Sequence, residues 1–331
     1  MKRSRWLILL LFLVIGYLMG PRPGTPVYKK ELPSIPLNAA EINSYISQKE
    51  ARHKIKPENE ARVIWWNDSS KEKTPYSIVY LHGFSASQEE GAPVHRNIAK
   101  QFGCNLFLAR LAEHGLDTMD ALRKLTADKY WESAKEAFAI AKNIGEKVIL
   151  MGTSTGGTNA LQLAAAYPND IHGVILLSPN IAINDPNAWL LNDPWGLQIA
   201  TLVRRSRYIT TPDQRDIFKK YWYSHYRLEG VVALEEMLES TMKEETFRAI
   251  RQPLLLLYYY KDEANQDKVV RVQAMREMFA SISTPDSQKR EAPLPNTGDH
   301  VIASPIKSKD VAGVQREIEK FLMEVMKLPR H

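Results

Sequence analysis

The chain has 331 residues, of which 44% are hydrophobic and 25% charged, values typical of a soluble globular protein. Its length allows two small domains or one large one, with a core that needs neither disulfides nor a structural metal. The net charge of +6 comes mostly from residues 1–31, which hold six Lys/Arg and one Glu and leave only +1 for the rest. This near-neutral part gives no reason to expect nucleic-acid binding. It also contains no P-loop, no dinucleotide fingerprint and no metal-ligand spacing, so we expect no cofactor and no metal.

Residues 1–20 have the pattern of a targeting segment. Three basic residues among the first five precede an uncharged run over residues 6–20, about 22 Å long as a helix and shorter than a ~30 Å hydrocarbon core. Length alone favours a cleaved signal peptide, but no A-x-A-like site follows. We therefore predict an uncleaved signal anchor, a single-pass transmembrane helix in a bacterial inner membrane with the globular part facing the periplasm or exterior. The alternative is secretion after cleavage.

Residues 21–38 are predicted to form an extended linker from the membrane. Prolines occupy positions 21, 23, 26, 33 and 36, and proline-rich segments are stiff and extended. Residues 39–53 follow with Ile42, Tyr45 and Ile46 at helical spacing, which indicates a first amphipathic helix.

From residue 61 onward, apolar strand patterns alternate with helical patterns. Near-continuous apolar strands separated by helices indicate a mostly parallel sheet covered on both faces, so the predicted fold class is α/β. The single Cys104 lies in one of the apolar runs and is interpreted as a buried hydrophobic residue. Strands are predicted at 61–66, 76–81, 104–109, 148–151, 174–177 and 254–260, and helices at 93–102, 127–144, 270–281 and 311–326.

The alternation stops between residues 181 and 251. This stretch contains three tryptophans, four tyrosines and a helix-like run at 231–242, but no strand pattern. We interpret it as a mainly helical cap inserted into a core formed by residues 39–180 and 252–331. Open α/β sheets bind ligands at the carboxyl ends of their strands, which is where such a cap would lie. The alternative is a peripheral subdomain without substrate contact.

A candidate nucleophile follows the strand at 148–151. Residues 152–156 read Gly-Thr-Ser-Thr-Gly, which fits G-x-S-x-G, and a run of helix formers comes next. Strand, tight turn and helix are the context in which this motif exposes a serine at the top of a sheet. Flanking glycines allow the neighbouring elements to approach closely. We therefore predict Ser154 as the nucleophile.

A serine hydroxyl needs a base and an acid that orients the base. Of the eight histidines, His300 lies in a glycine-containing turn before the final helix, where the order nucleophile–acid–histidine requires the base. The acid should lie in the loop after the strand at 254–260. Asp267 is the preferred candidate because a helix follows it closely, and Asp262, nearer the strand end, is the alternative.

The oxyanion formed during acyl transfer needs two backbone N–H donors. We expect one from Thr155, directly after the nucleophile. The second should come from the loop after the strand at 76–81, where Gly83 permits a turn and the Phe84 N–H is the predicted donor. His82 in the same loop is interpreted as structural.

With these motifs in order, the chain resembles the α/β-hydrolases, and in particular the branch of monoacylglycerol lipases, carboxylesterases and serine aminopeptidase-like hydrolases. The resemblance covers residues ~75–325 and includes Leu-His-Gly-Phe at 81–84, Arg-Leu-Ala-Glu-His-Gly-Leu at 110–116 and Gly-Asp-His at 298–300. It implies the same nucleophile, base and oxyanion donors, with an aspartate as third member. One departure is Glu113, where branch members often have glycine, and it is expected to put a carboxylate near the top of the sheet.

The predicted function is a serine hydrolase that cleaves a small-molecule acyl ester, as a carboxylesterase or lipase does, through an acyl-enzyme. The aromatic-rich cap favours an apolar acyl or aryl group. Amide or peptide hydrolysis by the same residues is the alternative, and a catalytically silent, membrane-tethered binding module is a third possibility. We expect membrane contact through residues 1–20 and no nucleic-acid partner, and the sequence indicates no oligomeric state.

Overall fold

A seven-stranded sheet forms the centre of the molecule in a computed structural model that describes residues 2–331. The strand order is β1-β3-β2-β4-β5-β8-β9; β1 runs antiparallel to β3, and the other neighbours are parallel. The predicted mostly parallel α/β sheet is therefore confirmed. The strands are β1 (Arg62–Ile64), β2 (Thr74–Leu81), β3 (Asn105–Leu108), β4 (Gly145–Thr153), β5 (Ile171–Leu177), β8 (Leu254–Tyr258) and β9 (Lys289–Pro293).

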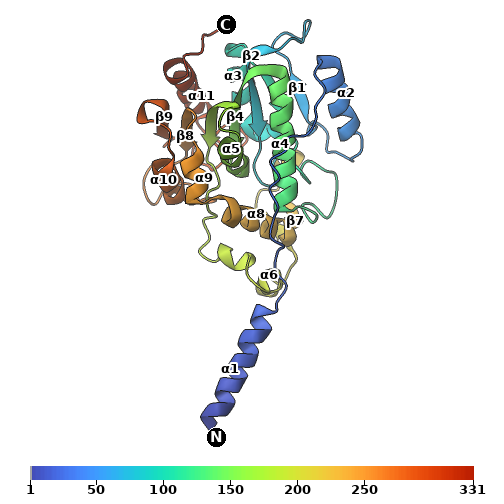
Figure 1. The fold of residues 1–331 in the computed structure, drawn as a ribbon, viewed down its shortest axis with the longest axis vertical. Helices are drawn as coiled ribbons and strands as arrows, with labels where there is room; N and C mark the ends of the chain where they lie inside the picture. The colour runs from blue at the N-terminus through green and yellow to red at the C-terminus, as the bar shows by residue number, and fades with distance from the viewer. Residues whose placement is uncertain (1) are drawn as a thin grey trace.

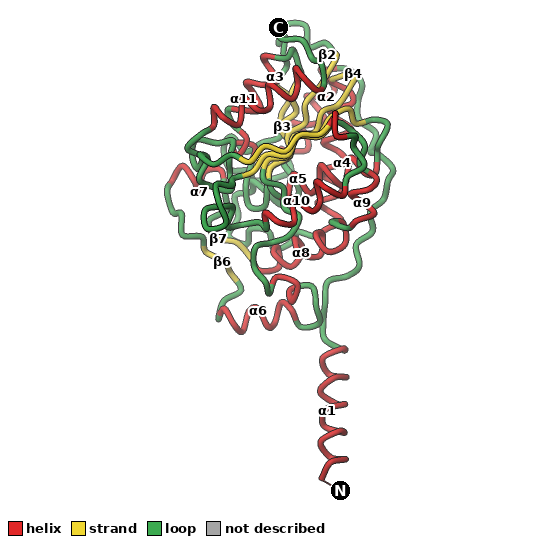
Figure 2. The backbone as a smooth tube through the Cα atoms, turned by 90° about the vertical axis from the view of Figure 1, so that its left-hand side faces the viewer, coloured by secondary structure: helices red, strands yellow, loops and turns green. Residues whose placement is uncertain are grey.

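Helices cover both faces of this sheet (Figure 1). Seen nearly edge-on, the sheet lies between α3 and α11 on one side and α4, α5 and α10 on the other (Figure 2). The helices of the core are α2 (Ala39–Glu50), α3 (Val94–Gln101), α4 (Ala127–Ile144), α5 (Thr155–Ala166), α10 (Val272–Ser281) and α11 (Val311–Lys320), the last continued by a π-helical turn at Phe321–Val325.

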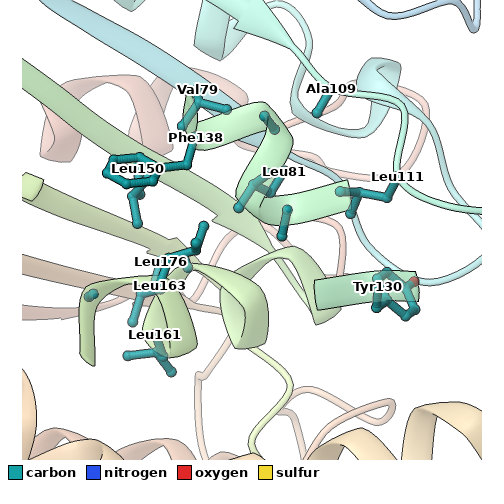
Figure 3. Packing of buried hydrophobic residues seen from close by; sticks show 14 of the residues in the cluster. Val79, Leu81, Ala109, Leu111, Tyr130, Phe138, Leu150, Leu161, Leu163 and Leu176 are labelled. Atoms are coloured by element: carbon teal, nitrogen blue, oxygen red, sulfur yellow. The ribbon is translucent and has the colours of Figure 1, made fainter. Parts of the chain in front are cut away.

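Alternating strand residues supply the two hydrophobic clusters that hold these layers together. Val79, Leu81 and Leu150 point toward the face covered by α4 and α5, whereas Ile78 and Ile149 point toward α3 and α11. Figure 3 shows strand residues of the first cluster packed against Phe138 and the leucines of α5. Because both faces are buried, the strands read in sequence as continuous apolar runs.

Helix α4 coincides with its predicted range. Thr126 caps its N-terminus by accepting the Lys129 N–H, Asp128 lies in its first turn, and Gly145 follows its last residue. Other boundaries differ from the prediction. The strand expected at 254–260 ends at Tyr258, and the helix expected at 39–53 ends at Glu50. The helix expected at 311–326 changes to a π-helical turn after Lys320. Strand β9 was not predicted, because it is a polar strand at the edge of the sheet.

The chain between β5 and β8 forms a cap on the core. Its helices are α6 (Gly196–Arg204), α7 (Asp216–Tyr221), α8 (Leu228–Thr241) and α9 (Glu244–Ala249). It also contains a two-stranded antiparallel sheet of β6 (Tyr208–Thr210) and β7 (His225–Arg227), for which the sequence shows no strand pattern.

The cap packs directly on the loops at the carboxyl ends of the core strands. The Tyr223 N–H donates to the Ser85 carbonyl oxygen at 2.7 Å. Phe218 and Trp222 cluster with Ala86 and Val301 from two core loops. These contacts place the cap over the edge of the sheet where its strands end.

The N-terminal segment consists of α1 (Lys2–Leu18) and an extended strap. Helix α1 points away from the body of the molecule (Figures 1 and 2). Within residues 2–331, none of the helices has the length and apolar character needed to cross a membrane. Helix α1 has 17 residues, which correspond to a length of about 26 Å.

The proline-rich strap lies along the core and is not a free linker. It passes beside α4 (Figure 1), where the indole N–H of Trp131 donates to the Lys29 carbonyl at 2.6 Å and the Lys135 ammonium to the Glu31 carbonyl at 2.8 Å. Ile35 is buried. The strap is extended, as expected, but side chains of α4 donate hydrogen bonds to its backbone carbonyls and hold it on the core.

Candidate active site

Ser154 occupies a strained corner between β4 and α5. Its φ of 52° is one that L-residues rarely adopt, a strain of order 1–3 kcal/mol. The surrounding backbone holds this conformation: the Ser154 N–H donates to the Leu177 carbonyl at 2.9 Å, and its own carbonyl accepts the Asn180 N–H at 2.9 Å. A Cβ on Gly152 would lie 2.4 Å from the Gly156 carbonyl oxygen, which explains the first glycine of the motif.

His300 and Asp267 meet on the loops that follow β9 and β8. The His300 Nδ1 is 2.6 Å from the Asp267 Oδ2, and the other carboxyl oxygen of Asp267 accepts the N–H groups of Val269 and Val270 at 2.8 and 3.2 Å. Asp267 is buried, with 2% of its surface exposed. With Nδ1–H directed at Asp267, the Nε2 of His300 is left as the basic nitrogen.

The electrostatic surroundings of His300 favour its protonated form. Burial by itself lowers the pKa of His300, but the charge and hydrogen bond of Asp267 raise it, with further contributions from the charges of Glu90 and Asp299. The net result is a pKa above the ordinary value of 6.5. An imidazole that gains a proton readily, held by a buried carboxylate, suits a general base.

Asp262, the alternative acid, lies apart from this pair. Its carboxyl group accepts the N–H groups of Ala264 and Asn265 and the side-chain amide of Asn265, so it closes a turn within its own exposed loop. These hydrogen bonds lower the pKa of Asp262. The structure therefore brings Asp267, and not Asp262, to His300.

The two expected oxyanion donors flank the nucleophile. Thr155 is the first residue of α5, where helical N–H groups have no partner within the helix. In the loop after β2, the Phe84 N–H has no acceptor among residues 2–331, although the N–H groups on both sides are bonded: Gly83 donates to Glu90 and Ser85 to His114. Among the four residues from Gly83 to Ala86, the predicted amide is thus the one without an acceptor in the described chain.

His82 and His114 are structural, as the sequence indicated for the first of them. The His82 Nδ1 is 2.9 Å from the Gly83 carbonyl, and its Nε2 accepts the Leu111 N–H at 3.0 Å. Burial lowers the pKa of His82 to about 4 and that of His114 well below its usual value. Both imidazoles are therefore neutral at physiological pH and serve to join the two loops.

Glu113, the departure from the family pattern, pairs with a lysine of α4. Its backbone has a φ of 63°, in the left-handed region that favours glycine, and its carboxylate lies 3.3 Å from the Lys129 ammonium. Glu90 is the residue that sequence reasoning missed. It is buried beside Gly83, seven positions further along the chain. In the sequence it is only a glutamate shortly after the oxyanion loop, and no known motif spacing marks such a residue as part of the site.

A parallel sheet with a strained serine after its central strand, followed in chain order by a buried aspartate and its histidine partner, defines an α/β-hydrolase. A family model described as serine aminopeptidase, S33, matches residues 126–295, slightly more than half of the chain. The chain belongs to this family of hydrolases and is an enzyme. No curated protein sequence matches the chain.

Several solved structures, two of them described as lipolytic enzymes or a lipase, share this fold. A structure from a study of LipS and LipT, two metagenome-derived lipolytic enzymes, has a TM-score of 0.65 at 16% identity and covers 81% of this chain and 99% of its own. The monoacylglycerol lipase of Paleococcus ferrophilus has a TM-score of 0.56 at 15% identity, covering 79% and 97%. Est1E of Butyrivibrio proteoclasticus with bound ferulic acid reaches 0.55 at 15% identity, covering 81% and 95%. At such identities the likeness establishes the fold.

Proposed function

We propose that the enzyme hydrolyses an acyl ester through an acyl-enzyme on Ser154. The observation that carries this proposal is the buried pair of Asp267 and His300, which follows the strained Ser154 in the order that the fold requires. A carboxylate that orients a histidine, with its Nε2 free, is the arrangement that activates a serine hydroxyl.

In the proposed reaction, the Ser154 Oγ attacks the carbonyl carbon of the ester while its proton moves to the His300 Nε2. The N–H groups of Phe84 and Thr155 donate hydrogen bonds to the oxyanion. The intermediate collapses, the bond to the alcohol oxygen breaks, and the alcohol leaves with the proton from His300. Water then attacks the acyl-enzyme, again with His300 as base, and the carboxylic acid is released. Asp267 stabilises the imidazolium in both steps.

The surroundings of the Phe84 amide support an apolar acyl or aryl group. The Phe84 ring packs edge-on against Tyr226 of the cap, with 5.4 Å between ring centroids, and Gly230 of α8 lies beside it. Est1E, which shares the fold, binds ferulic acid, an aromatic acid. Amide hydrolysis is the second candidate, because the matching family is described by an aminopeptidase.

A matched panel of substrates tests the proposal. Purified protein would be assayed on p-nitrophenyl esters of increasing acyl length and on p-nitroanilides of amino acids. Ester hydrolysis with kcat/KM at least 100-fold above that for the anilides supports our proposal. A preference for anilides would establish the second candidate, and a protein inactive on both, though folded, would point to the silent binding module.

A further inference from the structure

Glu90 is a buried carboxyl group beside the nucleophile that the proposed reaction leaves unused. It lies in the 3-10 turn at Gln88–Gly91, and 2% of its surface is exposed. The neighbouring Glu89 pairs with Arg96, whereas Glu90 has no lysine or arginine partner in the described part of the chain. Burying a carboxyl group without a cation costs folding free energy. Its position therefore calls for an explanation in the chemistry of the site.

The contacts of Glu90 reach the oxyanion loop, the nucleophile and the base. Its Oε2 accepts the Gly83 N–H at 2.6 Å. A Cβ on Gly83 would lie 2.9 and 3.0 Å from the two Glu90 oxygens and 3.0 Å from the Ser154 Cβ, so the carboxyl group and Ser154 flank the same side of Gly83. Glu90 also interacts electrostatically with His300.

Two successive peptide groups around Gly83 are held by side chains. The Gly83 N–H is bonded to Glu90, and the Gly83 carbonyl accepts from the His82 Nδ1 at 2.9 Å and from the Ala86 N–H at 3.3 Å. In a trans peptide the carbonyl and the following N–H point in opposite directions. Fixing the Gly83 carbonyl on His82 therefore directs the Phe84 N–H away from His82, where it has no acceptor among the described residues.

We propose that Glu90 is a positioning residue with two effects on the reaction. By accepting the Gly83 N–H it fixes the backbone that aims the Phe84 amide at the oxyanion, and by its negative charge it stabilises the protonated form of His300. This inference rests on the proposed hydrolase function and adds to it a third carboxyl-bearing group that acts through the loop and the base.

The titratable groups around Glu90 fit this role. His300 and Asp299 face it from the loop after β9, Tyr80 from β2 and Tyr130 from α4. Burial raises the pKa of Glu90 to about 7, although its hydrogen bond with Gly83 and the charge of His300 lower it. The pKa values of Glu90 and His300 are both raised, and the charge of each group acts on the other, so the two titrations are coupled.

Two substitutions separate the hydrogen bond from the charge. Glu90→Ala removes both, and we expect kcat on a p-nitrophenyl ester to fall at least ~10-fold with KM nearly unchanged, since a misdirected oxyanion donor weakens only the transition state. Glu90→Gln keeps an acceptor for Gly83, and kcat should recover to within about threefold of wild type. For Glu90→Gln, the acid limb of kcat/KM against pH should move to lower pH, because the negative charge of Glu90 that raises the pKa of His300 is gone. Glu89→Gln is the matched control and should change neither.

A trifluoromethyl ketone, which forms a tetrahedral oxyanion on the serine, provides a second readout. Glu90→Ala should weaken its inhibition by about the same factor as kcat. Wild-type kcat and an unshifted acid limb in both variants would overturn the role of Glu90 while leaving the hydrolase intact. Equal loss in the alanine and glutamine variants would also overturn it. If Glu90→Ala does not fold, the pH profile of Glu90→Gln decides. A wild type inactive on esters and unreactive to the ketone would instead contradict the proposed function.

Discussion

At the scale of single residues, the chemistry depends on the acidic side chain that meets His300. Asp267 uses one carboxyl oxygen for the imidazole and the other for two backbone N–H groups, so its position is fixed on both sides. Asp262 is five positions earlier in the same loop, and its carboxyl group accepts hydrogen bonds from N–H groups of its own turn. The two carboxylates are close in the sequence, but they differ in burial and in hydrogen-bond partners, and this difference decides which of them serves His300.

Replacing each aspartate by asparagine tests this distinction. Asp267→Asn should lower kcat on a p-nitrophenyl ester by roughly 10³–10⁴-fold, because the amide no longer holds the correct tautomer of His300 or stabilises its charge. Asp262→Asn is the matched control and should stay within about twofold of wild type, as its side chain is exposed and remote from the base. A large loss confined to Asp262→Asn would refute the assignment.

The pH dependence of activity follows from the raised pKa of His300. A general base works only when it is neutral, so activity is lost as the pH falls through this pKa. Because the charges of Asp267, Glu90 and Asp299 outweigh the effect of burial, the acid limb of kcat/KM should lie above pH 6.5, the ordinary histidine value. Initial rates from pH 5 to 9 measure it. An acid limb well below 6.5 would show that these carboxylates do not act on the base.

At the scale of elements, the close approach of β2 and α5 depends on Gly156. A Cβ at this position would lie 1.9 Å from the Leu81 carbonyl oxygen, which is backbone and has no room to move. Leu81 is the last residue of β2, directly before the oxyanion loop. The second glycine of the motif therefore brings the nucleophile and the oxyanion donors together.

We predict that Gly156→Ala destabilises the protein by about 1–3 kcal/mol or more and abolishes esterase activity, because α5 must move away from β2. Thermal unfolding and an ester assay measure the two effects. Gly24→Ala is the control, since no atom lies within 4 Å of a Cβ placed there. A Gly156→Ala protein with the wild-type melting temperature and activity would contradict the packing described above.

The elements that could be predicted are those whose sequence pattern matches their burial. Helix α4 has a cap, an amphipathic repeat and a terminal glycine, and β4 contains the apolar run at 148–151 between two helices. Strand β9 was missed because a half-exposed edge strand such as Lys289–Pro293 has no apolar pattern. The three-residue strands β6 and β7 are too short to show any period. Their pairing is set by the tertiary structure.

At the scale of the whole molecule, the order of the site residues along the chain could be predicted, but not all of their neighbours. Ser154, Asp267 and His300 each follow a strand, and parallel strands bring their carboxyl ends to one edge. Glu90 approaches Ser154 only because the loop after β2 folds back, a path with no sequence rule. The sequence also gave no sign that the strap would lie on α4.

We propose that residues 1–20 direct the chain to a membrane, either as a retained anchor or as a cleaved signal. The side chains of α1 from Trp6 to Leu18 are apolar almost throughout and exposed, an unfavourable arrangement for a helix in water. Cell fractionation with N-terminal sequencing should find either intact chain in the membrane fraction or a shortened chain starting near residue 21. Intact full-length chain in the soluble fraction would contradict this proposal.

The most direct test of the central claim is covalent labelling of the nucleophile. A fluorophosphonate forms a stable bond to an activated serine, and the labelled peptide can be mapped by mass spectrometry. We predict stoichiometric labelling of the wild-type protein on Ser154 and none of a folded Ser154→Ala variant. Equal labelling of the variant, or a folded wild type that is not labelled, would contradict the assignment of Ser154 as the nucleophile.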